Sequence, residues 1–585
     1  MSEKNNQLQA LRHTTEHVLT QAMYQLYPGI KMAMGPAIEN GFYFDFDPGE
    51  YKISESDFPK IEKEMQKIID ADLPLHREQI SIKEARQLFK NNEYKQEWLD
   101  EIEQKGEPAT VYWTGDQFVD LCAGPHVKST GEIKAYKLLS IAGAYWRGNE
   151  KNKMLTRIYG TAFLSQKDLA EYLRLQAEAK KRDHRKIGKS LKLFLFDEEF
   201  GQGLPLYRPK GATIRKEIMD FAFNTYLKRG YQPVSTPHIA NLNLWKRSGH
   251  WQFYRDSMYS PMQIDNEQYV LKPMNCPGHV KIYQAESHSY RDLPLRLAEM
   301  GTVYRYEKSG ELNGILRPRG FTQDDAHIIC TPKQLPGELV EMINLTEYIY
   351  NKFGFHKPLV SLSVRDPQNK EKFMGDNKSW ELAETALENA LKQKKLNYRR
   401  FKGEAAFYGP KIDFMYKDAL GRNQQLTTIQ VDFNLPEKFN MTYIDEKGKR
   451  RQPFMLHRAL LGSLERFMGV LIEHTAGNFP VWLSPVQVKV IPISQEQNLY
   501  AERVGEKLKE NDIRVEIDTR NETMQSKIRS AQLEKIPYMA IVGRKEAQNG
   551  TVSVRLRSEK DLGEQPLGEF IERIKDRIES KALEL

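Results

Sequence analysis

The stretch that decides the fold is Arg317-Pro318-Arg319-Gly320-Phe321-Thr322-Gln323-Asp324-Asp325-Ala326-His327, in the middle of a chain of 585 residues. A shorter stretch, Tyr304-Arg305-Tyr306-Glu307, lies just before it, and a third, Gly462-Ser463-Leu464-Glu465-Arg466, follows much later. Ahead of all three, residues 230–237 contain two prolines, each of which biases the preceding residue toward extended geometry. No single stretch is informative alone, but the three in this order form a specific pattern.

Composition excludes several classes of protein. The chain is several times longer than one hydrophobic core supports, which predicts three or four domains. No uncharged apolar run approaches the roughly 18 residues of a membrane helix, the first residues lack a secretory signal, and three cysteines are too few for a disulfide framework. We therefore predict a cytoplasmic protein without membrane spans. The net charge of +8 favours a polyanionic partner, although an ordinary basic surface explains it equally well.

Local patterning divides the chain into four parts. Residues 8–26 carry apolar side chains at helical spacing and open a mixed α/β region, 1–166. The charge-rich segment 167–192 predicts a helical linker that Gly188 ends. Its basic residues form either a solvated face or a contact to phosphate. The block 193–480 mixes strands with helices.

The fourth part, 481–585, alternates short strands with helical segments, which predicts a small α/β domain. The strands expected in this part are 486–493, 513–517, 538–542 and 551–556.

In order and spacing, the three stretches resemble the three sequence motifs of class II aminoacyl-tRNA synthetases. Two more, Met274–His279 and Phe407–Asp413, narrow the resemblance to the threonyl-tRNA synthetases. The resemblance implies an antiparallel-sheet catalytic core over 193–480, an editing domain over 1–166 and an α/β anticodon-binding domain over 481–585. It further implies a homodimer, and a form of the enzyme without the small ubiquitin-like domain that precedes the editing domain in many relatives.

Adenylate formation explains the arginines of the motifs. Negative charge grows on the α-phosphate as pyrophosphate leaves, and arginine forks with magnesium neutralise it. By the resemblance, Arg305 and Arg466 contact phosphates and Lys411 is a further catalytic residue. Asn313 replaces a histidine that the family usually has in a loop near the tRNA acceptor end. The residues implied to bind ATP are Arg305, Glu307, Arg317, Phe321, Gln425, Thr428 and Arg466.

Cys276, His327 and His457 are separated by 51 and 130 residues, so spacing alone predicts no metal site. Each is as easily an ordinary buried side chain. The resemblance implies that the three bind zinc. His279, three residues past Cys276, is the rival ligand. Three protein ligands leave zinc an open position, and zinc that grips both the amino group and the hydroxyl of threonine excludes valine. The residues implied to bind threonine are Met274, Gln323, Asp325, Tyr408, Gln425 and Ser463.

Serine lacks only one methyl group of threonine, worth about 1 kcal/mol of burial, so accuracy requires a second site. His13 and His17 lie four residues apart on one predicted helix face, and Cys122 and His126 repeat that spacing. Such a quartet indicates a metal hydrolase, or merely polar positions on an amphipathic helix. The resemblance implies an editing site for seryl-tRNA, with or without a metal. The assisting residues would be Lys95 and Asp120.

In the last block, the resemblance implies anticodon contacts, because polar and planar side chains suit unpaired bases; a solvated face is the alternative. The residues concerned are Asn521, Arg529, Glu546 and Arg555. The whole resemblance implies a ligase that joins L-threonine to its tRNA, using ATP, Mg²⁺ and one Zn²⁺ per subunit. A tRNA-binding regulator and an editing hydrolase acting in trans are rivals, and the intact motif arginines and zinc-ligand positions disfavour both.

Overall fold

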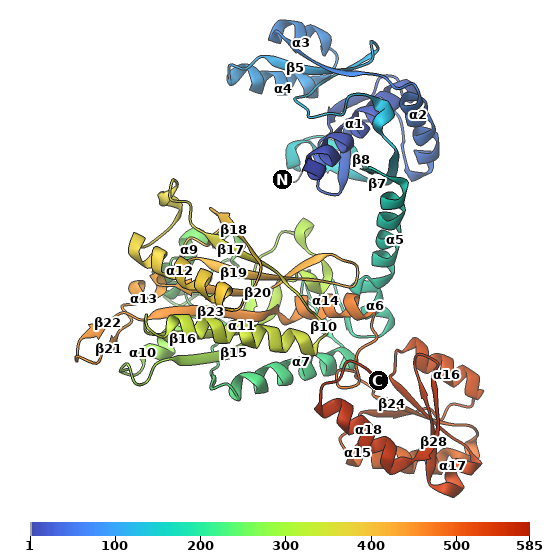
Figure 1. The fold of residues 1–585 in the computed structure, drawn as a ribbon, viewed down its shortest axis with the longest axis vertical. Helices are drawn as coiled ribbons and strands as arrows, with labels where there is room; N and C mark the ends of the chain where they lie inside the picture. Colours follow the sequence, from blue (N-terminus) through green and yellow to red (C-terminus); the bar gives the residue numbers. More distant parts are fainter. Residues whose placement is uncertain (1–2) are drawn as a thin grey trace. The chain divides into compact units, whose positions relative to one another are not determined.

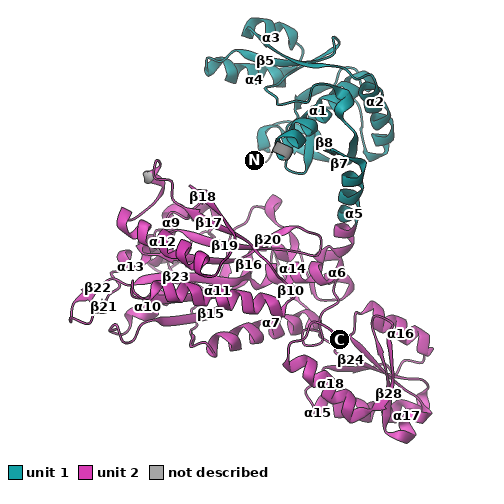
Figure 2. Cartoon of the chain, in the orientation of Figure 1, with its two compact units in different colours: residues 1–177 teal, residues 178–585 magenta. Residues whose placement is uncertain are grey.

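The computed structural model describes residues 3–585, which belong to two compact units, one ending at Ala177 and one beginning at Glu178 (Figure 2). The boundary falls within helix α5 (Gln166–Arg182). None of the described helices combines the length and apolarity needed to cross a membrane. Figure 1 follows the chain from blue to red.

The first unit is organised around α1 (Glu3–Leu26), the helix expected from residues 8–26. Apolar residues of α1 pack with the phenylalanines of β3 (Gly41–Asp47) and with α2 (Phe58–Asp70) in one core. The strand order β1-β3-β8-β7 makes an antiparallel sheet, and β4-β5-β6 makes a second one. The remaining elements are β1 (Lys31–Met34), β2 (Ala37–Ile38), β4 (Leu75–Ile80), α3 (Ile82–Leu88), α4 (Glu93–Gln104), β5 (Ala109–Thr114), β6 (Phe118–Leu121), β7 (Ala135–Tyr145) and β8 (Met154–Phe163).

The predicted linker is helical, but it forms two helices rather than one. Asp183 separates α5 from α6 (His184–Ser190), and its side chain caps α6 by accepting a hydrogen bond from the Arg185 amide. The prediction that Gly188 ends the helix is wrong, because Gly188 lies inside α6. A Cβ there would come within 2.5 Å of the Phe194 ring. The glycine therefore permits close packing instead of ending the helix.

The second unit contains an eight-stranded sheet that is antiparallel except at its two edge pairs, as the fold class requires. Residues 232–233 form the edge strand of the extended segment predicted over 230–237. Helices α7 (Pro209–Leu227) and α11 (Leu335–Lys352) cover one face of the sheet (Figure 1). In order across the sheet, the strands are β11 (Gln232–Pro233), β15 (Leu295–Tyr304), β16 (Gly320–Cys330), β23 (Phe454–Ser463), β20 (Asn423–Asp432), β19 (Lys411–Lys417), β17 (Leu359–Val364) and β18 (Tyr398–Lys402).

Smaller elements complete this core. Two of them matter for the site: α10 (Cys276–Gln284) begins at a candidate zinc ligand, and α14 (Leu464–Thr475) directly follows β23. The others are β9 (Phe194–Leu195), β10 (Leu206–Tyr207), β12 (Ile239–Asn241), α8 (Leu242–Ser248), α9 (His250–Phe253), β13 (Met262–Ile264), β14 (Glu267–Leu271), α12 (Asn377–Gln393), α13 (Asn434–Lys438), β21 (Tyr443–Ile444) and β22 (Arg450–Arg451).

The end of the chain folds into a five-stranded mixed sheet with helices, and the predicted strands appear at the predicted places. The strand order is β25-β24-β26-β27-β28, in which the first three are parallel. The elements are β24 (Val488–Pro492), α15 (Asn498–Glu510), β25 (Val515–Ile517), α16 (Met524–Leu533), β26 (Tyr538–Val542), α17 (Arg544–Asn549), β27 (Thr551–Leu556), β28 (Asp561–Pro566) and α18 (Leu567–Glu579).

Candidate functional site

The three candidate zinc ligands converge on one side of the eight-stranded sheet. His327 on β16 lies directly opposite His457 on β23, and Cys276 is the first residue of α10. One ligand atom from each lies within 4.8 Å of the other two, and His327 Nε2 is 2.9 Å from His457 Nδ1. Zinc bound at about 2.0–2.3 Å from its ligands requires ligand atoms less than about 4.6 Å apart. Sheet pairing therefore brings together residues that are far apart in sequence.

Neighbouring side chains orient the two imidazoles. His457 Nε2 lies 2.9 Å from Asp432 Oδ2, which leaves Nδ1 facing His327. His327 Nδ1 lies 2.7 Å from His279 Nδ1, and His279 Nε2 lies 3.0 Å from Glu299 Oε2. Metal-binding histidines usually engage a carboxylate through their second nitrogen in this way. His279, the alternative ligand, thus occupies a supporting position behind His327.

The electrostatics of this cluster suit a cation. Burial, reinforced by Asp325 and Asp432, raises the pKa of the Cys276 thiol, and burial lowers the pKa of His327. Without a cation the Cys276 thiol keeps its proton and the His327 ring stays neutral. A bound divalent cation would instead favour the deprotonated thiolate of Cys276. The donor set of one sulfur and two imidazole nitrogens fits zinc.

The threonine candidates surround this cluster. Asp325 Oδ2 accepts a hydrogen bond of 3.0 Å from Asn275, and its Oδ1 is 3.7 Å from His327 Nε2. Tyr408 lines a cavity together with Cys276 and His457. Three further candidates lie around them: Met274, whose sulfur is 3.0 Å from His250 Nε2, and the pair Gln323 and Ser463, which are opposite each other in the sheet.

Six of the seven ATP candidates form three groups. The Arg305 guanidinium lies 5.0 Å from the Phe321 ring centre, in cation–π range. Arg317 pairs with Glu307 at 2.8 Å. Three side chains converge on the Asp413 carboxylate at 2.7–2.9 Å, and these are Lys411, Gln425 and Thr428.

Arg466 lies in the first turn of α14, where its amide donates to Ser463 Oγ at 3.0 Å. Burial lowers the pKa of its guanidinium, and the positive charge of Arg317 adds to this effect. Two arginines that repel each other in a partly buried site bind phosphate favourably, because an anion relieves the repulsion. Arg305 lies near the start of α10, where its Nε donates a hydrogen bond of 3.3 Å to the Pro273 carbonyl oxygen.

Sequence reasoning did not assign four residues that the structure brings to these sites. Asp432 orients His457, Asn275 orients Asp325, and Asp413 holds Lys411 together with two ATP candidates. His250 Nε2 lies 3.9 Å from Cys276 Sγ. Asp413 and Asn275 belong to the motifs Phe407–Asp413 and Met274–His279, so their place in a motif was the signal that could have identified them. No sequence motif points to His250 or Asp432, which reach the site only through the folding of the chain.

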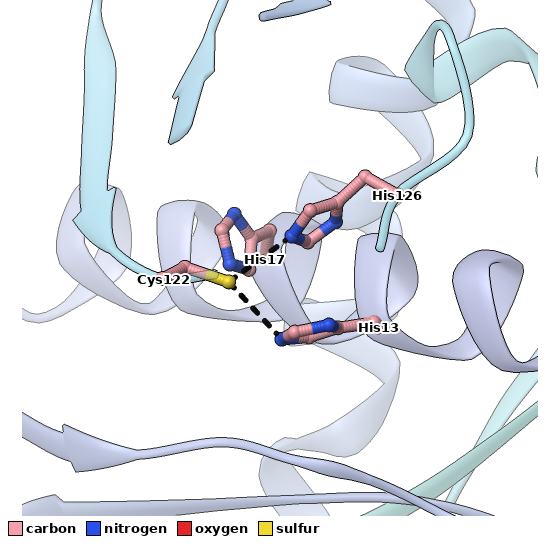
Figure 3. A group of neighbouring side chains, drawn as sticks. All are labelled: His13, His17, Cys122 and His126. Carbon is pink, nitrogen blue, oxygen red and sulfur yellow. Dashed lines mark hydrogen bonds between the residues drawn. The ribbon is translucent and has the colours of Figure 1, made fainter. Parts of the chain in front are cut away.

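The four editing candidates also gather in one place, within 4.8 Å of one another (Figure 3). His13 and His17 project from α1, while Cys122 and His126 come from the loop after β6. Cys122 Sγ lies 3.3 Å from His13 Nε2 and 3.2 Å from His126 Nε2. His126 Nδ1 faces Thr14 Oγ1 at 3.1 Å, which orients its ring.

His17 is buried, the other three members of the cluster are half-buried, and all four are neutral near pH 7. Burial lowers the pKa of His13 to about 4 and that of His126 to about 2, and it raises the pKa of Cys122 to about 12. Among the described residues, neither buried ring nitrogen of His17 has a hydrogen-bond partner. An unpaired buried polar group is costly, so His17 indicates a bound water or ion.

A cavity of about 460 Å³ adjoins the editing cluster and is lined by His13, Cys122, Lys95 and Asp120. Lys95 Nζ pairs with Asp120 Oδ1 at 2.8 Å although both side chains are nearly buried. Such a buried ion pair is weak evidence for stability alone. Its position at the cavity wall instead indicates a role toward whatever the cavity binds.

The anticodon candidates lie in the C-terminal part of the second unit. Arg555 on β27 is a partly buried arginine whose Nε has no partner among the described residues. Glu546 lies in the first turn of α17, where it accepts hydrogen bonds from the Gly543 amide and from Ser553 Oγ, each at 2.8 Å. Asn521 and Arg529 are exposed, in the loop after β25 and on α16.

Sequence profiles of three families match the chain. They are the tRNA synthetase class II core domain (G, H, P, S and T) over residues 259–475, the anticodon binding domain over 487–577, and the Threonyl and Alanyl tRNA synthetase second additional domain over 109–159.

Individual relatives and solved structures match the chain as well, and they point to the same family as the profiles. The Threonine--tRNA ligase of Thermotoga petrophila is 50% identical over 98% of this chain and 89% of its own length, and that of Caldanaerobacter subterraneus is 52% identical over 98% and 87%. The crystal structure of the RNA binding domain of threonyl-tRNA synthetase from Cryptosporidium parvum is 39% identical, with a TM-score of 0.64 over 68% of this chain and 98% of that one. The chain belongs to the threonine–tRNA ligase family of class II aminoacyl-tRNA synthetases.

Proposed function

We propose that this chain activates L-threonine with ATP, transfers it to tRNA(Thr), and hydrolyses seryl-tRNA(Thr) that forms in error. The main support is the placement of a Cys-His-His cluster beside the motif arginine Arg305, which is hydrogen-bonded to the backbone three residues before Cys276. Amino-acid recognition and phosphate chemistry would then meet in one site.

Cys276, His327 and His457 would hold a zinc ion, with Asp432 and His279 orienting the rings. A zinc ion held there would have room for both the amino nitrogen and the hydroxyl of threonine, because zinc at such sites can expand from four ligands to five. Asp325, already fixed by Asn275, would accept a hydrogen bond from that hydroxyl. Sites built to engage a hydroxyl reject analogues without it by on the order of 10⁴ or more, so valine would be excluded.

The remaining threonine candidates would complete the pocket wall. Tyr408 lines the same cavity as two zinc-ligand candidates, which supports a place beside the amino acid. The other wall residues of this proposal are Met274, Gln323, Gln425 and Ser463.

On the ATP side, Arg305 and Arg466 would neutralise the charge that grows at the phosphates, with Mg²⁺ bound by ATP and Lys411 nearby. Phe321 would stack under adenine, and Glu307 would accept from its amino group. Among the described residues, the half-exposed guanidinium of Arg317 pairs only with the carboxylates of Glu307 and Glu311, so it can turn toward the triphosphate. Gln425 and Thr428, held by Asp413, would line the nucleotide.

His13, His17, Cys122 and His126 would activate water against the ester of seryl-tRNA, beside the cavity that Lys95 and Asp120 help to line. Neutral imidazoles can accept a proton from that water, and the lowered pKa of His13, about 4, keeps it neutral near pH 7. The Lys95 ammonium would stabilise negative charge that develops on the ester oxygen.

We further propose the division into an editing domain (1–166), a linker (167–192), a catalytic domain (193–480) and an anticodon-binding domain (481–585). The last would contact the anticodon through Asn521, Arg529, Glu546 and Arg555. The protein would act as a cytoplasmic homodimer, and its three cysteines without disulfides suit a reducing compartment.

Threonine-dependent exchange of pyrophosphate into ATP, followed by charging of tRNA(Thr), tests the proposal. A ligase performs both reactions, whereas a tRNA-binding regulator or a hydrolase acting in trans performs neither. Purified protein that binds tRNA(Thr) or hydrolyses seryl-tRNA but shows no exchange would refute the ligase assignment.

A further inference from the structure

The pairing of β16 with β23 contains an irregularity between the two halves of the candidate active site. His327 is opposite His457 and Asp325 is opposite Ala459, but the next partner of β16, Gln323, is opposite Ser463. Two steps along β16 thus correspond to four steps along β23. Residues 460–462 form a bulge, and bulges commonly redirect side chains next to active sites.

The side chain of Asp324 accepts hydrogen bonds from the backbone amides of this bulge. Its two carboxylate oxygens accept hydrogen bonds of 3.0 Å from the amides of Leu460 and Leu461. Tyr226 donates a third, of 2.7 Å, and the guanidinium of Arg458 lies 3.6 Å away. One buried carboxylate therefore satisfies two amides that the strand pairing leaves free, and unpaired buried amides are rare because they are costly.

Asp324 cannot touch either substrate in the proposed site. Successive side chains of a strand point to opposite faces, so Asp324 lies on the face opposite to Gln323, Asp325 and His327. It is only 2% exposed, and Arg458 beside it is fully buried. Any effect of Asp324 on catalysis must pass through the backbone of β23.

Besides the hydrogen bonds to Asp324, the bulge depends on Gly462. Its φ is +72°, a conformation that other residues adopt with strain, and a Cβ there would lie 2.7 Å from the Leu426 carbonyl oxygen. Directly after Gly462, Ser463 caps α14 and fixes the turn that carries Arg466. The bulge thus sets where α14 begins.

We propose that Asp324 is a positioning residue, which holds the bulge so that Arg466 stands at the correct distance from the amino-acid pocket. The inference rests on the proposed function, because it assigns Arg466 to ATP and His457 to the threonine side. His457 is held independently, since β23 pairs with β20 through Ala459, before the bulge begins. Loosening the bulge should therefore disturb the nucleotide side and spare the zinc side.

The test compares Gly462→Ala and Asp324→Asn with Gly448→Ala in the full-length protein. Gly448 is the matched control, because its φ is also +72° but nothing lies within 4 Å of the position that a Cβ would take there. Kinetics of pyrophosphate exchange give KM for ATP and for threonine separately, and metal analysis gives zinc per chain. Both bulge variants should lose on the order of 10- to 100-fold in kcat/KM for ATP, since small displacements of catalytic groups have effects of this size. Zinc content and the control should stay within about twofold of the wild type, and KM for threonine should rise less than KM for ATP, because Ser463 beside the bulge is only one wall residue of a pocket that the zinc ligands anchor.

Gly462→Ala buries no unpaired charge, so it answers the question even if Asp324→Asn fails to fold. Unchanged kcat/KM for ATP in Gly462→Ala would overturn the inference, and so would equal losses toward both substrates or a loss of zinc. If the wild type shows no threonine-dependent exchange, the proposed function fails instead. Calorimetric ATP binding then decides the inference: weaker binding by Gly462→Ala than by Gly448→Ala supports it, and equal binding overturns it.

Discussion

His457 directs its Nε2 to Asp432 Oδ2 at 2.9 Å and thereby leaves its Nδ1 facing His327 Nε2 at the same distance. Asp432 is buried and belongs to β20, the neighbour of β23 in the sheet. The Asp432 carboxylate fixes which nitrogen of His457 is available to a metal. A residue on β20 therefore orients the candidate ligand on β23.

We expect Asp432→Asn to weaken zinc binding by roughly 10- to 100-fold, the usual cost of losing a carboxylate behind a metal-binding histidine. The measurement is zinc retention during titration with a chelator. Asp445→Asn, at a hairpin turn where the carboxylate pairs with Arg451, serves as the control and should retain zinc like the wild type. Equal retention by all three proteins would remove Asp432 from the site.

Cys276→Ser should abolish stoichiometric zinc and threonine activation together, because serine is a poor zinc ligand and the amino-acid pocket would lose its anchor. Metal analysis of the purified protein gives the answer. Cys330→Ala removes another buried thiol that lies outside the cluster, and it should keep one zinc per chain. Full zinc and undiminished threonine activation in Cys276→Ser would show that the metal, if any, binds elsewhere.

Replacing His13 and His17 with alanine should leave threonine activation and charging nearly intact, since both residues belong to the first compact unit and the motif residues to the second. Seryl-tRNA should accumulate, because the synthetic site distinguishes serine by one methyl group, roughly a 10- to 200-fold preference. His76→Ala alters an exposed histidine of the same unit and should not change the product. If the double variant makes no more seryl-tRNA than the wild type, the cluster is not the proofreading site.

Arg555→Ala should reduce the preference for the natural anticodon, because the planar guanidinium of this half-buried arginine suits hydrogen bonds to an unpaired base. We expect a loss of about 1–3 kcal/mol in discrimination, the range for a good base contact. Charging kinetics with wild-type and anticodon-substituted tRNA measure it. Arg544→Ala, an exposed arginine that pairs with Glu496, is the control. An unchanged preference in Arg555→Ala would exclude this residue.

The sequence predicted elements and motifs better than it predicted contacts between them. Short-range patterns correctly predicted the α1 helix, four of the five strands of the C-terminal sheet and the helical character of the linker, but they missed β28. Gly188 misled the prediction because a glycine that ends a helix and one that allows close packing against Phe194 look identical in sequence.

The candidate zinc site likewise depends on long-range contacts that local sequence patterns do not predict. Cys276, His327 and His457 could be grouped only through the resemblance, since no local spacing joins them. The support from Asp432 depends on β20 lying beside β23, and that order of strands is a long-range property. The bulge at 460–462 likewise appears only once both strands are paired.

Pyrophosphate exchange measured side by side with threonine, serine and valine tests the central claim most directly, because it depends on the Cys-His-His cluster, the arginines and ATP together. We predict strong exchange with threonine, exchange with serine lower by roughly 10- to 200-fold, and no detectable exchange with valine. Exchange with valine equal to that with serine would contradict recognition of the hydroxyl by a metal, and absence of exchange with threonine would contradict the account as a whole.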